Sequence, residues 1–173
     1  MTLPPFETDV LLRDIRIEPA RAEREKLPEG GPVWPEEASQ PFLRNLRGNK
    51  PVEIPVRPGP DAAEVIETPA VWCGYAVRHF GHFIAEQAPR LLAARRQRPD
   101  DLYLFLAPPR IAAEGLPGWF WDILAWYGLP RDQVRILTDT PALVRNLRVF
   151  PQAEHLVVGP QAGLAMEVIE EKA

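Results

Sequence analysis

The stretch "RHFGHFIAEQAPR", at residues 78–90, holds two of the three histidines of the chain. His79 and His82 are three residues apart, and Glu86 follows His82 after four. Imidazole and carboxylate groups at this spacing can form a general-base pair or supply ligands to a metal ion. Side chains four residues apart are neighbours on an α-helix, so His82 and Glu86 can touch. This stretch is therefore the first candidate for a functional site.

A helix expected over residues 81–97 would carry these groups on one side. At about 100° per residue, His82, Glu86 and Arg90 follow one another in a polar stripe. Phe80, Ile84 and Leu91 share the opposite side, which is expected to face a sheet; these six positions are read directly from the sequence.

Pro89 lies inside this expected helix. Proline has no backbone N–H and clashes with the carbonyl four residues earlier, at a cost of roughly 3 kcal/mol. The sequence therefore predicts a free carbonyl at Ala85 and a bend beside the His82–Glu86 pair.

Three interpretations of the stretch remain open from residue types alone. The first is the solvated beginning of an ordinary helix. The second is a metal site with His79, His82 and Glu86 as ligands, although the spacing differs from HExxH and neither Cys73 nor His155 lies near in sequence. The third is a catalytic or substrate-binding pair in which Glu86 orients His82 or raises its basicity.

The composition excludes several classes of protein. A length of 173 residues is enough for one domain with a real core, and 46% hydrophobic with 25% charged residues is typical of a soluble globular chain. A net charge of −4 provides no basic field for nucleic acid, so no nucleic-acid partner is expected.

The sequence also bears on compartment. The single cysteine, Cys73, cannot form an intrachain disulfide, which fits a reducing compartment. The first residues, "MTLPPFETDVLLRD", lack the pattern of a secretory signal, and no stretch reaches the roughly 18–20 apolar residues of a transmembrane helix. We expect a cytoplasmic protein with no transmembrane segment.

The order of the predicted elements indicates an α/β fold. Residues 1–69 form an irregular, proline-rich segment with short strands at 10–19 and 51–58 and a surface loop at 23–41. Residues 70–173 form a more regular unit within one compact molecule. We expect strands at 70–77, 102–109, 133–139 and 143–151, and helices at 81–97, 117–129 and 160–173.

This succession favours a Rossmann-like open sheet with flanking helices. The strand at 102–109 is a continuous apolar run, typical of a parallel strand buried on both faces. Loops after such strands place functional groups at the carboxyl edge of the sheet, and the step from 70–77 into the helix is such an edge.

The segment "GYAVRHFGHFIAEQAPRLLAARRQRPDDLYLFLAPP" resembles the opening block of glycosyltransferase family 61, the capsular-polysaccharide-type transferases. The likeness continues through "WFWDILAWYGLPRDQVRILTDTPALVRNLRVFPQ" and covers about residues 70 to 155. The family pattern of a glycine-bearing strand and a "GHF-x-x-E-x-x-x-R" helix falls here on Gly74, Gly81, His82, Phe83, Glu86 and Arg90.

The resemblance implies an N-terminal half of a GT-B-type enzyme. Family members have two Rossmann-like halves, and two such domains need roughly 300 residues. The later family segments, which would hold the nucleotide phosphates, have no counterpart in these 173 residues. The half expected here is the acceptor side.

The implied reaction is sugar transfer from a nucleotide-sugar donor to a hydroxyl of a glycan or other acceptor, without a metal or other cofactor. The resemblance places the base at His82 and Glu86, with either residue as the proton acceptor, and substrate contacts at His79, Gly81 and Arg90. From residue types alone Arg90 is more simply a surface arginine, and the aromatic residues at 119, 121, 126 and 127 are more simply core and interface groups. Cys73 is expected to be a small buried residue and His155 to be exposed.

Two alternatives to the transferase remain. One is a non-catalytic carbohydrate-binding or oligomerising module derived from such an enzyme, whose exposed apolar face would drive homodimer formation. The other is a small metal-dependent hydrolase that uses His79, His82 and Glu86.

Overall fold

The computed structural model describes residues 9–24, 27–36, 44–47, 50–51 and 53–151. The strands are β1 (Val10–Arg24), β2 (Leu27–Pro32), β3 (Leu46–Arg47), β4 (Lys50–Pro51), β5 (Glu64–Ile66), β6 (Ala70–Tyr75), β7 (Leu102–Leu106), β8 (Val134–Leu137) and β9 (Ala142–Val149). The helices are α1 (Phe80–His82), a π-helical turn (Phe83–Gln87), α2 (Ala88–Gln97), α3 (Pro109–Glu114), α4 (Gly118–Trp126) and a 3-10 turn (Arg131–Gln133).

A 7-stranded mixed sheet forms the body of the molecule, in the order β2-β1-β9-β6-β7-β8, with β5 also pairing with β9. Strands β6, β7 and β8 are parallel, and β9 is parallel to β6 on its other side. Strand β1 runs antiparallel to β9 and β2. The N-terminal segment thus contributes β1 and β2 to the same sheet as the strands after residue 70. The predicted α/β class, an open sheet with flanking helices, is confirmed at this level.

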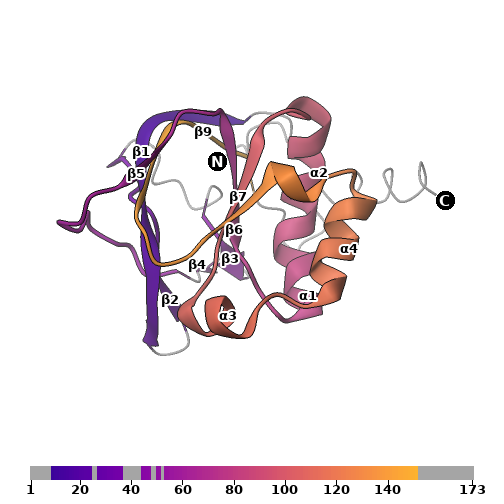
Figure 1. The fold of residues 1–173 in the computed structure, drawn as a ribbon, viewed down its shortest axis with the longest axis horizontal. Helices are drawn as coiled ribbons and strands as arrows, with labels where there is room; N and C mark the ends of the chain where they lie inside the picture. The colour runs from indigo at the N-terminus through magenta and orange to yellow at the C-terminus, as the bar shows by residue number, and fades with distance from the viewer. Residues whose placement is uncertain (1–8, 25–26, 37–43, 48–49, 52, 152–173) are drawn as a thin grey trace.

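The central strands are buried on both faces, as their continuous apolar runs predict. On β6 and β7, Val71, Cys73, Tyr103 and Phe105 belong to a core shared with α2 and α4. The alternate residues of these strands belong to a second core with β1, β5 and β9: Ala70, Trp72, Leu104 and Leu106. Figure 1 shows α1, α2 and α4 together on one side of β6 and β7, with β1 and β5 on the other.

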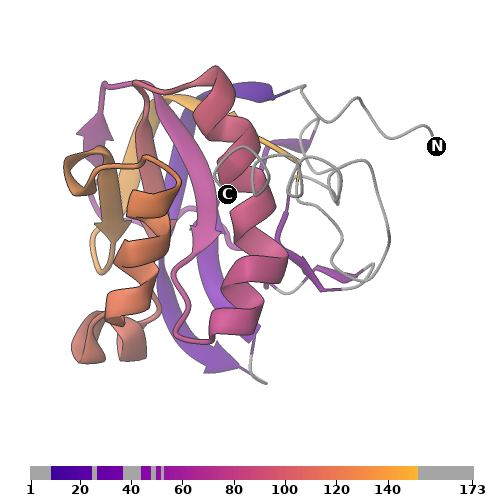
Figure 2. The ribbon, with the colours of Figure 1, turned by 90° about the vertical axis from the view of Figure 1, so that its right-hand side faces the viewer.

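Residues 80–97 form one continuous helix in which the middle turn is π-helical (Figure 2). Within this turn the N–H of Ala88 bonds to the carbonyl of Phe83, five residues back. Pro89 has no N–H to offer the carbonyl of Ala85, and a wider turn just before a proline is one way for a helix to accommodate it. The sequence predicted an irregularity here, and it takes the form of one extra residue in a turn.

Several predicted elements are confirmed and others are wrong. Strands at 70–77, 102–109, 133–139 and 143–151 and helices at 81–97 and 117–129 are present, with ends shifted by a few residues. The strand at 10–19 continues to Arg24. The helix predicted at 160–173 lies outside the described residues.

Two predictions for the N-terminal segment are corrected. Part of the surface loop predicted at 23–41 is strand β2, where Gly30, Gly31 and Pro32 are buried against β1. This strand was not predicted because it contains two glycines and two prolines, which usually mark turns. The strand predicted at 51–58 is also wrong: among the described residues of this stretch, only Pro51 in β4 and an isolated bridge at Ile54 pair with other residues.

Candidate active site

The candidate site lies where the helix of residues 80–97 begins. This helix follows β6, and the register aligns Tyr75 of β6 with Leu106 of β7, and Leu106 with Leu137 of β8. The parallel strands therefore end at a common edge, and residues 76–79 carry the chain from this edge into α1. Loops at the carboxyl edge of parallel strands are the usual location of sites in α/β proteins.

His82 and Glu86 are in direct contact, as their spacing predicts. Nδ1 of His82 lies 2.8 Å from Oε1 of Glu86. The two side chains differ in environment, because that of His82 is 38% exposed and that of Glu86 is 5% exposed. A carboxylate oxygen only accepts hydrogen bonds, so in this pair Nδ1 of the imidazole is the donor.

This arrangement defines the chemistry that His82 can perform. A proton on Nδ1, held by the carboxylate, leaves Nε2 of the neutral ring as a hydrogen-bond acceptor. An acceptor nitrogen on a part-exposed ring can take a proton from a bound hydroxyl, while the buried carboxylate stabilises the imidazolium that forms. The geometry favours His82 as the base and Glu86 as its orienting group, and not the reverse.

His79 and Gly81 complete the beginning of the helix. His79 is the N-cap residue, and its Nδ1 accepts a hydrogen bond of 3.3 Å from the backbone N–H of His82. The rings of His79 and His82 have centroids 4.4 Å apart. A Cβ atom at Gly81 would come within 3.2 Å of Cε1 of His79. Gly81 thus provides space for the His79 ring.

The expected orientation of the helix is partly wrong. Leu91 is buried, as predicted, but Phe80 is 55% exposed and Ile84 38% exposed. Instead Glu86 and Arg90 are turned inward, with exposures of 4% and 1%. The π turn adds a residue between the first and last parts of the helix, so a single 100° projection cannot describe both parts.

Gln87 is a further buried residue of this turn. Its amide Nε2 donates to the backbone carbonyl of Tyr75, the last residue of β6. This bond ties the π turn to the edge of the sheet. No motif in the sequence indicates Gln87, because its partner is a backbone carbonyl.

Arg90 is a buried arginine, so the prediction of a surface side chain is wrong. Its Nη2 donates to the carbonyl of Arg44 at 3.2 Å, and its Nη1 lies 3.5 Å from Oδ1 of Asn45. Burial disfavours the charged guanidinium and lowers the pKa of Arg90 to about 10. The nearby Glu53 opposes that shift. Arg90 therefore meets the N-terminal segment in the interior.

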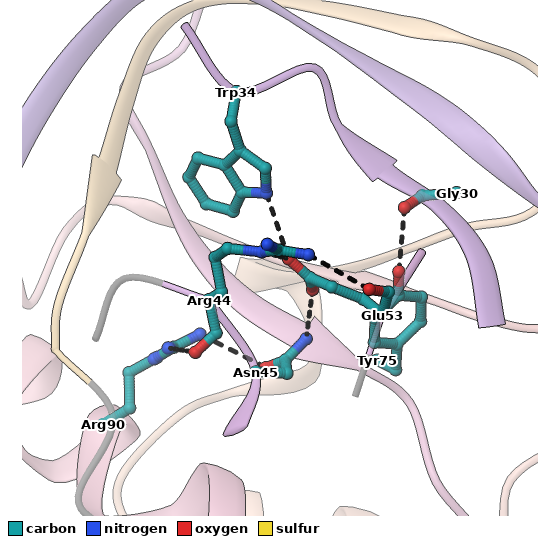
Figure 3. Close-up of polar contacts among 7 residues, drawn as sticks. All are labelled: Gly30, Trp34, Arg44, Asn45, Glu53, Tyr75 and Arg90. Atoms are coloured by element: carbon teal, nitrogen blue, oxygen red, sulfur yellow. Dashed lines mark hydrogen bonds and ion pairs between the residues drawn. The ribbon is translucent and has the colours of Figure 1, made fainter. Parts of the chain in front are cut away.

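Glu53 is the centre of the polar cluster that receives Arg90 (Figure 3). Its Oε1 accepts from Nε of Arg44 at 2.8 Å and from Nε1 of Trp34 at 3.1 Å, and its Oε2 accepts from Nδ2 of Asn45 at 3.2 Å. Arg44 also donates to the backbone carbonyl of Glu53 at 3.0 Å. Nearby, the hydroxyl of Tyr75 donates to the carbonyl of Gly30 at 2.8 Å. The cluster joins the N-terminal segment to β6 and α2.

Gly74 allows Asn45 to approach β6. Its φ angle is +95°, and a Cβ atom there would lie 2.6 Å from Oδ1 of Asn45. The pairing of β6 with β7 shifts register between Trp72 and Gly74, which is typical of a β-bulge. The resemblance singled out Gly74 by its motif, and the structure supplies a physical reason for glycine there.

The other residues considered as candidates are Cys73, His155 and the possible metal ligands. Cys73 is buried, as predicted, and burial raises the pKa of its thiol well above the usual range. His155 lies outside the described residues. In the described part of the chain, no three His, Cys, Asp or Glu side chains gather as metal ligands would, so His79, His82 and Glu86 do not form the ligand set of the hydrolase alternative.

The aromatic residues of α4 divide between core and surface. Trp119 and Trp121 are half-buried against the core that β6 and β7 share with α2 and α4. Tyr127, which follows α4, is buried. Trp126 is 44% exposed. Trp119 also packs edge-on against Phe80, with centroids 5.4 Å apart. Trp119, Trp121 and Tyr127 thus confirm the prediction that these aromatic residues are core groups.

Comparisons of the chain with models of protein families, with curated proteins and with solved structures gave no match. None of the helices in the described ranges is long and apolar enough to cross a bilayer.

Proposed function

We propose that this chain is the acceptor-side half of a glycosyltransferase resembling family 61. In this proposal a nucleotide sugar supplies the sugar, and His82 takes the proton from the attacking hydroxyl of a glycan or other acceptor. The Rossmann-like, GT-B-type architecture and a cytoplasmic location are parts of the same proposal. The observation that carries it is the 2.8 Å contact between Nδ1 of the part-exposed His82 and the buried carboxylate of Glu86.

The chemistry of sugar transfer fits this pair. As the acceptor oxygen attacks the anomeric carbon, the bond from that carbon to the phosphate oxygen breaks, and its electron pair leaves with the phosphate. The acceptor hydroxyl must lose its proton in the same process, so a base is needed within about 2.6–3.2 Å. Nε2 of His82 is the group available for this role, and Glu86 holds the ring in the required tautomer.

Titration calorimetry of the full chain with UDP-, GDP- and CMP-sugars tests whether a donor is bound. Saturable binding of one nucleotide class would mean that this acceptor-side half retains a donor site of its own and would support sugar transfer by the chain. Binding that persists when the sugar is omitted from the nucleotide would locate the recognition in the nucleotide. Failure of every nucleotide sugar to bind would contradict sugar transfer by this chain. It would leave a module that binds only the acceptor.

The alternative module, which binds carbohydrate or oligomerises without catalysis, is favoured by one specific observation. Phe80 and Ile84 are exposed on the same side of the helix, and Phe80 packs against the half-buried Trp119. An exposed apolar surface of this kind can mediate contact with another protein or a second copy. Sedimentation equilibrium tests the oligomerising form: a dimer that dissociates in Phe80→Ser would support it, and a monomer at all concentrations would contradict it.

A further inference from the structure

Two imidazole rings lie side by side at the beginning of the helix. The centroids of His79 and His82 are 4.4 Å apart, the rings are tilted by 47°, and both side chains reach solvent. Their Nδ1 atoms have different partners, and these partners give the two rings opposite hydrogen-bonding roles.

The partner of His82 is an acceptor. Glu86 receives a hydrogen bond from Nδ1 of His82, so the hydrogen of the neutral ring is on Nδ1 and Nε2 is left as an acceptor. The buried carboxylate fixes this tautomer.

The partner of His79 is a donor. The backbone N–H of His82 points at Nδ1 of His79, so this nitrogen must be the acceptor and the hydrogen of the neutral ring must be on Nε2. Gly81 makes the contact possible, since a Cβ there would lie 3.2 Å from Cε1 and 3.4 Å from Nδ1 of the His79 ring. A side chain at this position would force the ring to shift.

The beginning of the helix therefore carries one acceptor nitrogen and one donor N–H on two rings whose centroids are 4.4 Å apart. A vicinal diol of a sugar has the complementary pattern, because one hydroxyl can donate its hydrogen while the oxygen of the next accepts one. A lone hydroxyl can also bridge both nitrogens, but the N–H of His79 would then engage a lone pair of the oxygen that must attack, so the adjacent hydroxyl is the better acceptor for His79.

We propose that His79 and His82 together recognise a vicinal diol of the acceptor. The acceptor hydroxyl that is hydrogen-bonded to Nε2 of His82 gives its proton to that nitrogen and attacks the anomeric carbon of the donor. The adjacent hydroxyl accepts a hydrogen bond from Nε2–H of His79. This inference rests on the proposed function and narrows the acceptor to a sugar with a hydroxyl next to the reacting one. His79 is then a substrate-binding residue, and Gly81 a residue that positions it.

The tautomers can be measured without any substrate by long-range 15N–1H NMR on the full chain. We expect the proton on Nδ1 in His82 and on Nε2 in His79. Gly81→Ala should give a mixture of tautomers at His79 and leave His82 unchanged. Nδ1 protonation of His79 would overturn the inference and leave the role of His82 untouched, whereas Nε2 protonation of His82 would overturn both the inference and the proposed base.

Binding of methyl hexosides tests the diol itself. Saturable 15N shifts are expected at both histidines, with about three- to tenfold weaker binding for deoxy analogues that lack one hydroxyl of the diol. His79→Ser retains a good N-cap residue, so the fold should be kept while the preference for the diol is lost. No shift with any hexoside, or equal binding of the deoxy analogues, would overturn the inference. Because these readouts need neither donor nor turnover, they separate its failure from that of sugar transfer.

Discussion

At the scale of single residues, the environment of each group decides its role more than its type does. His82 and Glu86 touch as any i, i+4 pair can. Their environments differ, because the carboxylate of Glu86 is buried and the ring of His82 is part-exposed. Arg90, one turn further, is a residue of the interior. The same polar stripe of sequence thus contains a part-exposed imidazole, a buried carboxylate and a buried guanidinium.

Arg90→Met should destabilise the fold by about 1–3 kcal/mol. The change relieves the cost of burying a cation, but it leaves the carbonyl of Arg44 and Oδ1 of Asn45 without this donor. Glu53 keeps Arg44 as its ion-pair partner, so the loss stays below that of an isolated buried charge.

Urea unfolding measures this change, with Arg96→Met as the matched control. Arg96 is an exposed arginine on the same helix, and its replacement should alter the free energy of unfolding by less than about 0.5 kcal/mol. Equal stability of the two variants would show that Arg90 has no special place in the interior.

At the scale of elements, the sequence predicted those that have a clear period. The apolar runs at β6 and β7 and the helices around residues 81–97 and 117–129 follow from hydrophobic pattern. Strand β2 could not be recognised, because its two glycines and two prolines usually mark turns.

The candidate site was predictable to a similar extent. The contact of His82 with Glu86 follows from spacing alone. The polar cluster around Glu53 does not, since Trp34 is 19 residues from Glu53 and Arg90 is 45 residues from Asn45 along the chain. The π turn also escaped prediction, and with it the inward direction of Glu86.

Gly74→Ala should destabilise the protein by more than the roughly 1–3 kcal/mol of backbone strain expected at a positive φ. The additional loss comes from the close approach of Asn45, whose Oδ1 would be 2.6 Å from the new Cβ. Thermal unfolding of the variant measures the total.

Gly115→Ala is the matched control, because Gly115 also has a positive φ of +76° but no atom within 4 Å of the place that a Cβ would occupy. In an Asn45→Ala background the cost of Gly74→Ala should fall toward that of Gly115→Ala. Equal costs for both glycines in the parent chain would argue against a steric role for Asn45.

At the scale of the whole molecule, one sheet joins the N-terminal segment to the region that bears the site. Strand β1 pairs with β9, and the cluster around Glu53 bonds to α2, so the segment is part of the support of the candidate site. The three tyrosines of the chain are all affected by burial in this body. Burial raises the pKa of Tyr75, Tyr103 and Tyr127 above the ordinary value of 10.

These shifts predict unfolding at alkaline pH. A tyrosine whose pKa is higher in the folded state keeps its proton while the unfolded chain loses it, so stability falls as the pH rises above about 10. The buried Cys73 acts in the same direction from about pH 9. Arg90, whose pKa is lowered to about 10, acts in the opposite direction, since the unfolded chain then binds the extra proton. One opposing group does not offset four.

Ultraviolet absorbance of tyrosinate and circular dichroism, followed in one pH titration, measure this effect. Because all three tyrosines share the shift, tyrosinate should appear together with the loss of helical signal in a single cooperative step. Normal ionisation of a tyrosine near its ordinary pKa in a chain that keeps its dichroism would contradict the packing described here.

The central claim is that His82, oriented by Glu86, is the base of a sugar transfer. The most direct measurement is the initial rate of glycan product formation, by mass spectrometry, for the full chain with the nucleotide sugar that it binds. We expect His82→Ala and Glu86→Gln to lose about 10²–10⁴-fold in rate with nearly unchanged melting temperatures, while the exposed control Arg110→Ala keeps the parent rate. A full rate in His82→Ala or in Glu86→Gln would contradict the claim.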